Sequence, residues 1–303
     1  MNRRAALCAF GTLVAGLATA RTVGSQAMAL ETRPIPRTGE RIPAVGLGTW
    51  QAFDVAGEGP DRASAKEALR TLAELGGRMV DSSPMYGAAE AAVGTFATEL
   101  GLAGKLFVAT KVWTSGREAG IRQMEASFRK LRVDRLDLMQ VHNLVDTDAH
   151  LATLAGWKKE GRVRYLGVTH YHAGAYAELE AAIKKHRPEF AQFNYSLAER
   201  DAERRLLDLA ASAGVAVIVN RPFAEGAMFS RVKGKALPDW AREVDCESWA
   251  QVFLKYILGH PAVTCAIPGT RNPKHVADNL GAARGRLPDA PLRKRMAAYF
   301  DAL

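Results

Sequence analysis

The sequence predicts an α/β fold, a (β/α)8 TIM barrel, and three observations point to it. Short, strongly apolar segments alternate with segments whose apolar residues recur at helical spacing. The alternation occurs eight times within roughly 250 residues, which is typical of such a barrel. The alternative, an open doubly wound sheet, usually has a G-x-G-x-x-G turn after its first strand, and the sequence has no such turn.

The predicted elements follow in order along the chain. Apolar runs, as expected for strands buried on both faces, cover residues 46–50, 79–81, 106–111, 136–142, 165–169, 190–195, 215–219 and 263–267. Helical spacing covers residues 64–75, 89–100, 120–131, 150–160, 173–185, 200–213, 246–258 and 273–283. A long loop, residues 222–243, interrupts the series. Pro34, Pro36 and Gly39 favour a small N-terminal β-hairpin that closes the bottom of the barrel, and residues 288–303 hold one extra C-terminal helix.

Residues 1–29 have the composition of an export signal. Arg3 and Arg4 stand at the start, an apolar run covers residues 5–20, and small residues at 18–20 and 27–29 offer two cleavage sites. The paired arginines favour the twin-arginine route and its translocase, with a Sec signal or a disordered tail as the alternatives. We therefore expect a signal peptide at residues 1–29, one barrel domain at 30–303, and a periplasmic or exported protein, which would otherwise be cytoplasmic.

Charge and cysteine content narrow the classes of partner. Removal of residues 1–29, with three arginines and no acid, would lower the net charge from +9 to +6. The remaining basic clusters, at 129–130, 158–159, 184–187 and 293–295, lie near predicted helix ends, where cations complement the helix dipole. We expect no nucleic-acid partner.

The three cysteines are too few for a disulfide scaffold and lack metal-ligand spacing. No apolar run has the ~20 residues of a membrane span. The expected mature protein is a monomer that binds a small molecule and no metal.

Four polar residues occur where predicted strands end. Asp81 ends the second strand and Tyr86 follows it, Lys111 ends the third strand, and His142 ends the fourth. Each alone has an ordinary structural role as a helix cap, a buried ion-pair partner or a hydrogen-bonded core residue. Together, on three consecutive strands of a barrel, they face the mouth where active sites are built.

The chemistry of these four residues suits proton transfer to an oxygen atom. A tyrosine hydroxyl has an ordinary pKa of ~10, and a nearby ammonium group lowers that pKa by stabilising the phenolate. A carboxylate keeps the lysine protonated, and a histidine can hydrogen-bond the same reacting oxygen. The set therefore predicts movement of one proton onto or off an alcohol or carbonyl oxygen.

Several ordered motifs resemble those of the aldo-keto reductase family, in a member of bacterial type. Residues 81–87 resemble its Asp-x4-Tyr-Gly motif, with Glu90 following. Residues 110–113 resemble its lysine strand, residues 138–143 its histidine strand, and residues 267–270, with Pro273 and Asn279, its adenosine-side motif. The resemblance runs from about residue 42 to about residue 283, nearly the whole expected mature chain.

The resemblance implies a NAD(P)H-dependent oxidoreductase that reduces an aldehyde or ketone to an alcohol. Tyr86 would be the general acid, Lys111 would tune it and Asp81 would hold Lys111. His142 would orient the substrate carbonyl, and the substrate pocket would be lined by Trp50 and Trp113. The implied cofactor-binding residues are Thr49, Thr169, His170, Gln192, Arg221, Phe223, Gly269, Thr270, Arg271, His275 and Asn279.

The sequence departs from the family pattern at several cofactor positions. Thr169-His170 stands where Ser-Asn is common, and Asn220 stands where a tyrosine often stacks on the nicotinamide. Arg221 either reaches the cofactor pyrophosphate or pairs with Glu225. His275 replaces an arginine that often clamps the 2′-phosphate of NADP. Arg271 and Lys274 could take over that role, and we expect NADP(H) to be preferred over NAD(H).

Three other functions fit the same barrel less well. A Schiff-base aldolase with Lys111 as nucleophile needs an unpaired lysine, and Asp81 argues against that. A metal-dependent hydrolase would need paired histidines on the first strand, which are absent from the sequence. A non-catalytic cofactor-binding sensor or partner protein has less need of Tyr86.

Overall fold

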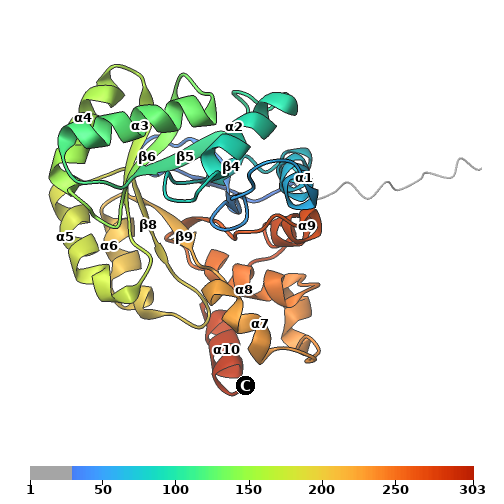
Figure 1. Ribbon diagram of the computed structural model, residues 1–303. Helices are drawn as coiled ribbons and strands as arrows, with labels where there is room; N and C mark the ends of the chain where they lie inside the picture. The colour runs from blue at the N-terminus through green and yellow to red at the C-terminus, as the bar shows by residue number, and fades with distance from the viewer. Residues whose placement is uncertain (1–28) are drawn as a thin grey trace, which may run out of the picture.

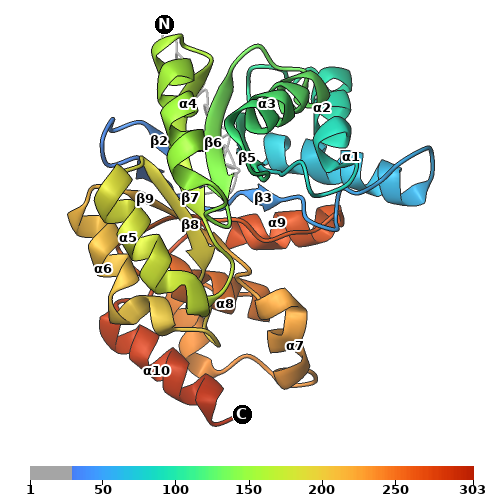
Figure 2. The same ribbon diagram turned by 60° about the vertical axis from the view of Figure 1, so that its left-hand side comes forward.

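A computed structural model describes residues 29–303, and Figures 1 and 2 show a ring of strands surrounded by helices. The barrel strands are β3 (Leu47–Gly48), β4 (Met79–Asp81), β5 (Phe107–Val112), β6 (Leu136–His142), β7 (Val163–Thr169), β8 (Phe190–Asn194), β9 (Ala216–Asn220) and β10 (Val263–Ala266). They pair in parallel in sequence order from β3 to β10. Parallel bridges from Val45 to Ala266 and from Gly48 to Gly269 join the two ends of this sheet. The predicted barrel is confirmed, and the open-sheet alternative is wrong.

The N-terminal hairpin also forms as predicted. Strands β1 (Thr32–Pro34) and β2 (Arg41–Pro43) pair antiparallel. Ile35 and Ile42 are fully buried in one cluster with Met79, Phe107 and Phe190, which begin or lie near the start of barrel strands. Because these apolar side chains fill the interior at the N-terminal ends of the strands, the hairpin closes that end of the barrel.

Helices cover the outside of the ring (Figure 2). They are α1 (Pro60–Glu74), α2 (Ala89–Glu99), α3 (Arg117–Leu131), α4 (Thr147–Lys159), α5 (Tyr176–His186), α6 (Leu206–Ser212), α8 (Trp249–Leu258) and α9 (Pro273–Gly281). Two more helices lie at one end of the molecule, α7 (Ala227–Arg231) in the loop after β9 and α10 (Ala290–Asp301) at the end of the chain. The last is the predicted extra helix. Within the described part of the chain, no helix is both long and apolar enough to cross a membrane.

Three expectations about helices need correction. The helix predicted over residues 200–213 is divided, because Arg205 leaves the helical conformation between the 3-10 turn η2 (Asp201–Arg204) and α6. The long loop 222–243 contains η3 (Ala224–Gly226), α7 and η4 (Asp239–Val244). The basic cluster 293–295 lies in the first half of α10, not near its C-terminal end, and Arg293 pairs with Glu203 there.

The predicted signal peptide, residues 1–29, lies outside the described residues, apart from Ala29.

Candidate active site

A cavity of about 910 Å³ opens at the C-terminal ends of the barrel strands. Most of the residues predicted to form the site line this cavity: Thr49, Trp50, Asp81, Tyr86, Trp113, His142, Thr169, Gln192, Arg221, Phe223, Gly269, Thr270, His275 and Asn279. The strand register explains this convergence, because parallel pairing places Gly48 beside Asp81 and His142 beside Thr169. The cavity thus gathers side chains from strands around the ring at the C-terminal end of the barrel.

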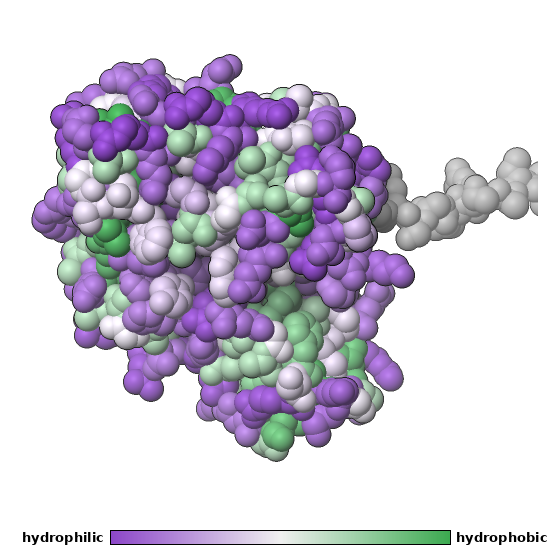
Figure 3. Space-filling view, viewed as in Figure 1, coloured by the Kyte–Doolittle hydropathy of each residue, from purple (hydrophilic) through white to green (hydrophobic). Residues whose placement is uncertain are grey.

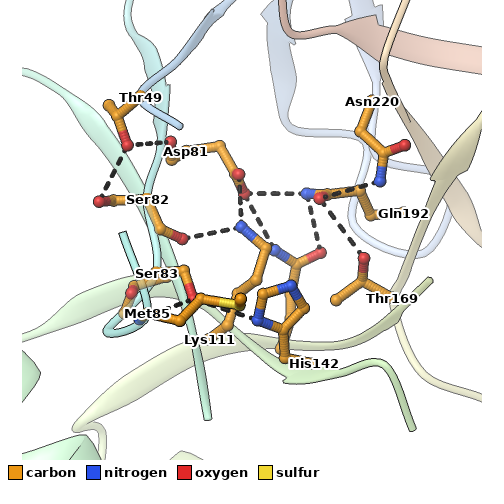
Figure 4. A network of polar contacts seen from close by, with 12 residues as sticks. Thr49, Asp81, Ser82, Ser83, Met85, Lys111, His142, Thr169, Gln192 and Asn220 are labelled. Carbon is orange, nitrogen blue, oxygen red and sulfur yellow. Dashed lines mark hydrogen bonds and ion pairs between the residues drawn. The ribbon is translucent and has the colours of Figure 1, made fainter. Parts of the chain in front are cut away.

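Lys111 lies behind the cavity wall and forms a buried ion pair with Asp81. Its Nζ is 2.5 Å from Oδ2 of Asp81 and donates a second hydrogen bond to the carbonyl oxygen of Ser82 at 2.8 Å. Lys111 is fully buried and Asp81 nearly so. Figure 4 shows the carboxylate and the ammonium group facing each other. Because removal of either partner would leave a charge buried without compensation, the pair has to be kept as a unit.

The second oxygen of Asp81 is held by two glutamine amides. Gln192 Nε2 donates to Oδ1 at 2.9 Å, and Gln140 Nε2 donates to the same atom at 3.1 Å. Gln140 was not predicted from the sequence, although its alternation with His142 on β6 places both side chains on the same face of that strand. Both oxygens of the Asp81 carboxylate therefore accept hydrogen bonds, Oδ2 from Lys111 and Oδ1 from the two glutamines.

These contacts and the burial of the site determine the protonation states of Lys111 and Tyr86. Burial alone would lower the pKa of Lys111, but Asp81 and Tyr86 raise it above its ordinary value. Burial raises the pKa of Tyr86, and the Lys111 ammonium, 5.0 Å from the centre of the ring, only partly opposes this effect. The expected lowering of the Tyr86 pKa is thus wrong, because burial outweighs the effect of the ammonium charge. A neutral Tyr86 keeps the proton that a general acid must donate, and a charged Lys111 is unsuited to Schiff-base formation.

His142 is held beside Tyr86 as a neutral ring. Their ring centres lie 6.1 Å apart in an edge-to-face arrangement. Burial and the charge of Lys111 lower the pKa of His142 to about 2. Its Nδ1 lies 3.1 Å from the hydroxyl oxygen of Ser83, a residue that was not singled out in the sequence. His142 therefore acts in this site as a hydrogen-bonding group without a charge.

The cavity has an apolar wall as well as this polar base. Large apolar side chains that are more than a third exposed line it, namely Trp50, Met85, Trp113, Tyr171 and Phe229. Figure 3 shows apolar side chains gathered on the surface around α7 and α8. The side-chain amide of Gln123 forms two hydrogen bonds with the backbone of Trp113. Its Oε1 accepts from the Trp113 N–H at 2.6 Å, and its Nε2 donates to the Trp113 carbonyl at 3.1 Å. Trp113 therefore presents its exposed ring from a fixed loop.

Other predicted cofactor residues are placed less simply. Arg221 pairs with Glu225 at 3.3 Å and donates to the Tyr171 carbonyl at 3.0 Å, so the alternative that pairs it with Glu225 describes this structure. His170 and Arg271 are not among the lining residues. The His170 ring stacks on Tyr171, and Arg271 pairs with Asp61 at 3.0 Å. The roles of His170 and Arg271 in cofactor binding stay predictions.

Asn220 extends the polar network from Asp81 across the sheet. Its Nδ2 donates to the His170 carbonyl at 3.0 Å and to Gln192 Oε1 at 3.4 Å. Thr169 Oγ1 donates to the same Gln192 oxygen at 3.4 Å. The Oδ1 atom of Asn220 is buried and has no hydrogen-bond partner among the described residues. A buried acceptor of this kind is costly unless a ligand or water supplies a donor.

Comparison with known proteins identifies the family. The model of the aldo/keto reductase family matches residues 44–295. Methylglyoxal reductase YeaE of Escherichia coli is 31% identical over 266 residues, covering 85% of this chain and 91% of that protein. The 9,11-endoperoxide prostaglandin H2 reductase of Trypanosoma cruzi is 28% identical over 262 residues, covering 84% and 87%. A Klebsiella pneumoniae aldo-keto reductase crystallised with NADPH has a TM-score of 0.74 at 25% identity, covering 90% and 96%. The chain belongs to the aldo/keto reductase family.

Proposed function

We propose that the protein reduces an aldehyde or ketone to an alcohol with a hydride from a nicotinamide cofactor, NADPH in preference to NADH. The observation that carries the proposal is the base of the cavity. A tyrosine that retains its proton stands beside a buried Lys111–Asp81 pair and a neutral His142. This arrangement can deliver one proton to an oxygen atom and stabilise the charge that results.

The residues around Asn220 fit a nicotinamide carboxamide. The buried oxygen of Asn220 lacks a donor, and the carboxamide of the cofactor has an NH2 group that could supply one. Thr169 and Gln192 line the same part of the cavity. When bound, the cofactor supplies a hydride to the carbonyl carbon of the substrate.

The chain's own residues carry out the proton chemistry. Tyr86 donates its proton to the carbonyl oxygen, and the resulting phenolate is stabilised by the Lys111 ammonium. Asp81 keeps Lys111 charged and in place through the contact of 2.5 Å. His142 donates a hydrogen bond to the same oxygen and so orients the carbonyl.

The test is reduction of a panel of carbonyl compounds, including methylglyoxal and a neutral aromatic aldehyde, with NADPH oxidation as the readout. Tyr86→Phe should lower kcat/KM by roughly 10²–10⁴-fold, since that is the usual contribution of a general acid. The variant should bind NADPH as the wild type does. Full activity of Tyr86→Phe would sink the mechanism. Tight NADPH binding without turnover of any carbonyl would instead favour the sensor function.

Support for the NADPH preference comes from the Klebsiella relative crystallised with NADPH and from basic residues at the start of α9. Arg271 and Lys274 lie there beside Thr270 and His275, which line the cavity. Arg271→Ala should raise the KM for NADPH and leave that for NADH unchanged. Use of NADH by the wild type at equal or better efficiency would contradict the preference.

Export is proposed on separate grounds. Arg3 and Arg4, the apolar run at residues 5–20 and the two cleavage sites support a twin-arginine signal. That route carries folded proteins, so the reductase could leave the cytoplasm with its cofactor bound. Mass spectrometry of the mature N-terminus and cell fractionation test this proposal, and an intact chain found only in the cytoplasm would refute it. We also propose a monomer, which sedimentation of the purified protein would test.

A further inference from the structure

Ser83 contacts one ring nitrogen of His142 and does not itself line the cavity. Its side chain is fully buried in the loop after β4 and is not among the residues that line the cavity. The hydroxyl oxygen lies 3.1 Å from Nδ1 of His142. The backbone N–H of Met85 donates to the same hydroxyl oxygen at 3.5 Å. Figure 4 shows Ser83 and Met85 grouped against one nitrogen of the imidazole while the other nitrogen points elsewhere.

The direction of the Ser83–His142 hydrogen bond follows from the donors available. The Met85 N–H already uses Ser83 Oγ as an acceptor. The only acceptor within hydrogen-bond distance of the Ser83 hydroxyl proton, among residues 29–303, is Nδ1 of His142. If Nδ1 carried a proton, the buried serine hydroxyl would have no acceptor, which is unfavourable. A bare Nδ1 is therefore favoured, and a neutral imidazole then carries its proton on Nε2.

The other ring nitrogen is free to meet a substrate. Nε2 of His142 has no hydrogen-bond partner among the described residues. It is also absent from the group of fully buried polar atoms that lack a partner, so it is accessible from the cavity. The ring itself lines the cavity. A proton on Nε2 is the one that can be donated to a carbonyl oxygen, whereas the opposite tautomer would present a lone pair to that oxygen.

We propose that Ser83 is a positioning residue that fixes the tautomer of His142, donating its hydroxyl proton to Nδ1 so that Nε2–H faces the substrate. The catalytic consequence rests on the proposed carbonyl reduction, but the tautomer itself does not. Because burial lowers the pKa of His142 to about 2, the ring stays neutral at ordinary pH. The tautomer then decides whether Nε2 carries a proton or a lone pair.

Nitrogen-15 NMR of protein labelled in its histidine rings tests the tautomer directly. The His142 signals are assigned by their absence from His142→Gln. The wild type should show a protonated Nε2 and a bare Nδ1 at His142. In Ser83→Ala the His142 signals should shift toward a mixture of the two tautomers, and Ser83→Thr, which keeps a hydroxyl, should restore the wild-type pattern.

Kinetics test the consequence for catalysis. Ser83→Ala should lower kcat for carbonyl reduction by about three- to tenfold, in line with loss of one hydrogen bond, and leave the Kd for NADPH unchanged. Ser127→Ala is the matched control, since Ser127 is also buried but donates to a backbone carbonyl within α3. That control should change neither kcat nor the His142 signals.

The outcomes separate the two proposals. A wild-type ring protonated at Nδ1, or a His142 tautomer that Ser83→Ala leaves unchanged, would overturn the inference about Ser83. A wild type that shows Nε2–H but reduces no carbonyl compound would overturn the proposed function and support the tautomer assignment.

Discussion

The two ends of the barrel are buried by different kinds of side chain. At the N-terminal end, Ile35 and Ile42 of the hairpin fill the interior with apolar groups. At the C-terminal end, Lys111 and Asp81 place opposite charges in an equally buried site. Apolar packing at the closed end gains stability with every methylene group that is removed from water. A buried ion pair gains little over apolar residues of the same volume, because desolvation of the charges offsets their attraction. The closed end is therefore built for stability, and the open end accepts a cost in stability for chemistry.

The backbone shows the same difference. Of the ten described non-glycine residues with positive φ, two, Arg132 and Arg187, follow helices α3 and α5 at the N-terminal end of the barrel. The other eight lie in segments that follow the C-terminal ends of strands: Gln51, Asn143, Leu144, Asp146, Arg221, Ala224, Glu225 and Asp245. In the described hairpin, residues 32–43, positive φ occurs only at a glycine, Gly39. Such conformations are unfavourable for residues with a Cβ atom and persist where the surrounding structure holds them. Most of these unfavourable conformations therefore lie at the end of the barrel that holds the cavity.

The largest effect should come from breaking the charge pair at the open end. Lys111→Met leaves the Asp81 carboxylate buried, with the amides of Gln140 and Gln192 as its remaining partners among the described residues. We expect a loss of ~3–5 kcal/mol in the free energy of unfolding, because an uncompensated buried charge remains. Activity should fall as well, since the phenolate of Tyr86 would lose its stabilising cation. Urea denaturation and NADPH oxidation measure the two effects.

A double variant separates stability from activity at this site. In Asp81→Asn/Lys111→Met both charges are gone, so part of the lost stability should return while activity stays low. If the double variant recovers activity along with stability, the charge pair serves folding alone and the contrast between the two ends of the barrel fails.

A somewhat smaller effect, on stability alone, is expected at the closed end. Ile42→Ala removes apolar volume from a fully buried position and should cost about 3 kcal/mol, with Ile42→Val costing about 1 kcal/mol. Neither variant should change kcat or the Kd for NADPH at a temperature where it is folded. A kcat that falls in proportion to the lost stability would show that the two ends are coupled.

How far the sequence predicts the molecule differs between the same two regions. Apolar periodicity predicts strands such as β4 and β6 with their exact bounds, because a buried parallel strand has a simple pattern. Asp81, Tyr86 and His142 could be placed at the mouth because the topology brings the strand ends together. Periodicity fails for residues 222–243, where short helices lack enough turns to show a pattern.

Within the site, the sequence identifies residue types better than their partners. Ser83 and Gln140 are ordinary polar residues in the sequence, and their contacts with His142 and Asp81 become visible only in the folded structure, where the loop after β4 and strand β6 meet. The pKa of Tyr86 is another example. A neighbouring ammonium lowers it, but the burial that raises it depends on the packing of the whole mouth.

The smallest effect is expected from pH, and its near absence is informative. Carbonyl reduction needs a protonated Tyr86 and a charged Lys111, and the pKa values of both groups are raised in the structure. Both groups therefore keep their protons until the pH exceeds their ordinary values of ~10, and His142, with a pKa of about 2, does not change its charge at higher pH. We expect kcat/KM for reduction to be flat from about pH 6 to about pH 9 and to decline only above that range. His142→Gln should lower kcat/KM at every pH without changing the shape of the profile. A decline centred near neutral pH that disappears in His142→Gln would show that the histidine titrates, and the C-terminal end of the barrel would then be more open to water than its burial indicates.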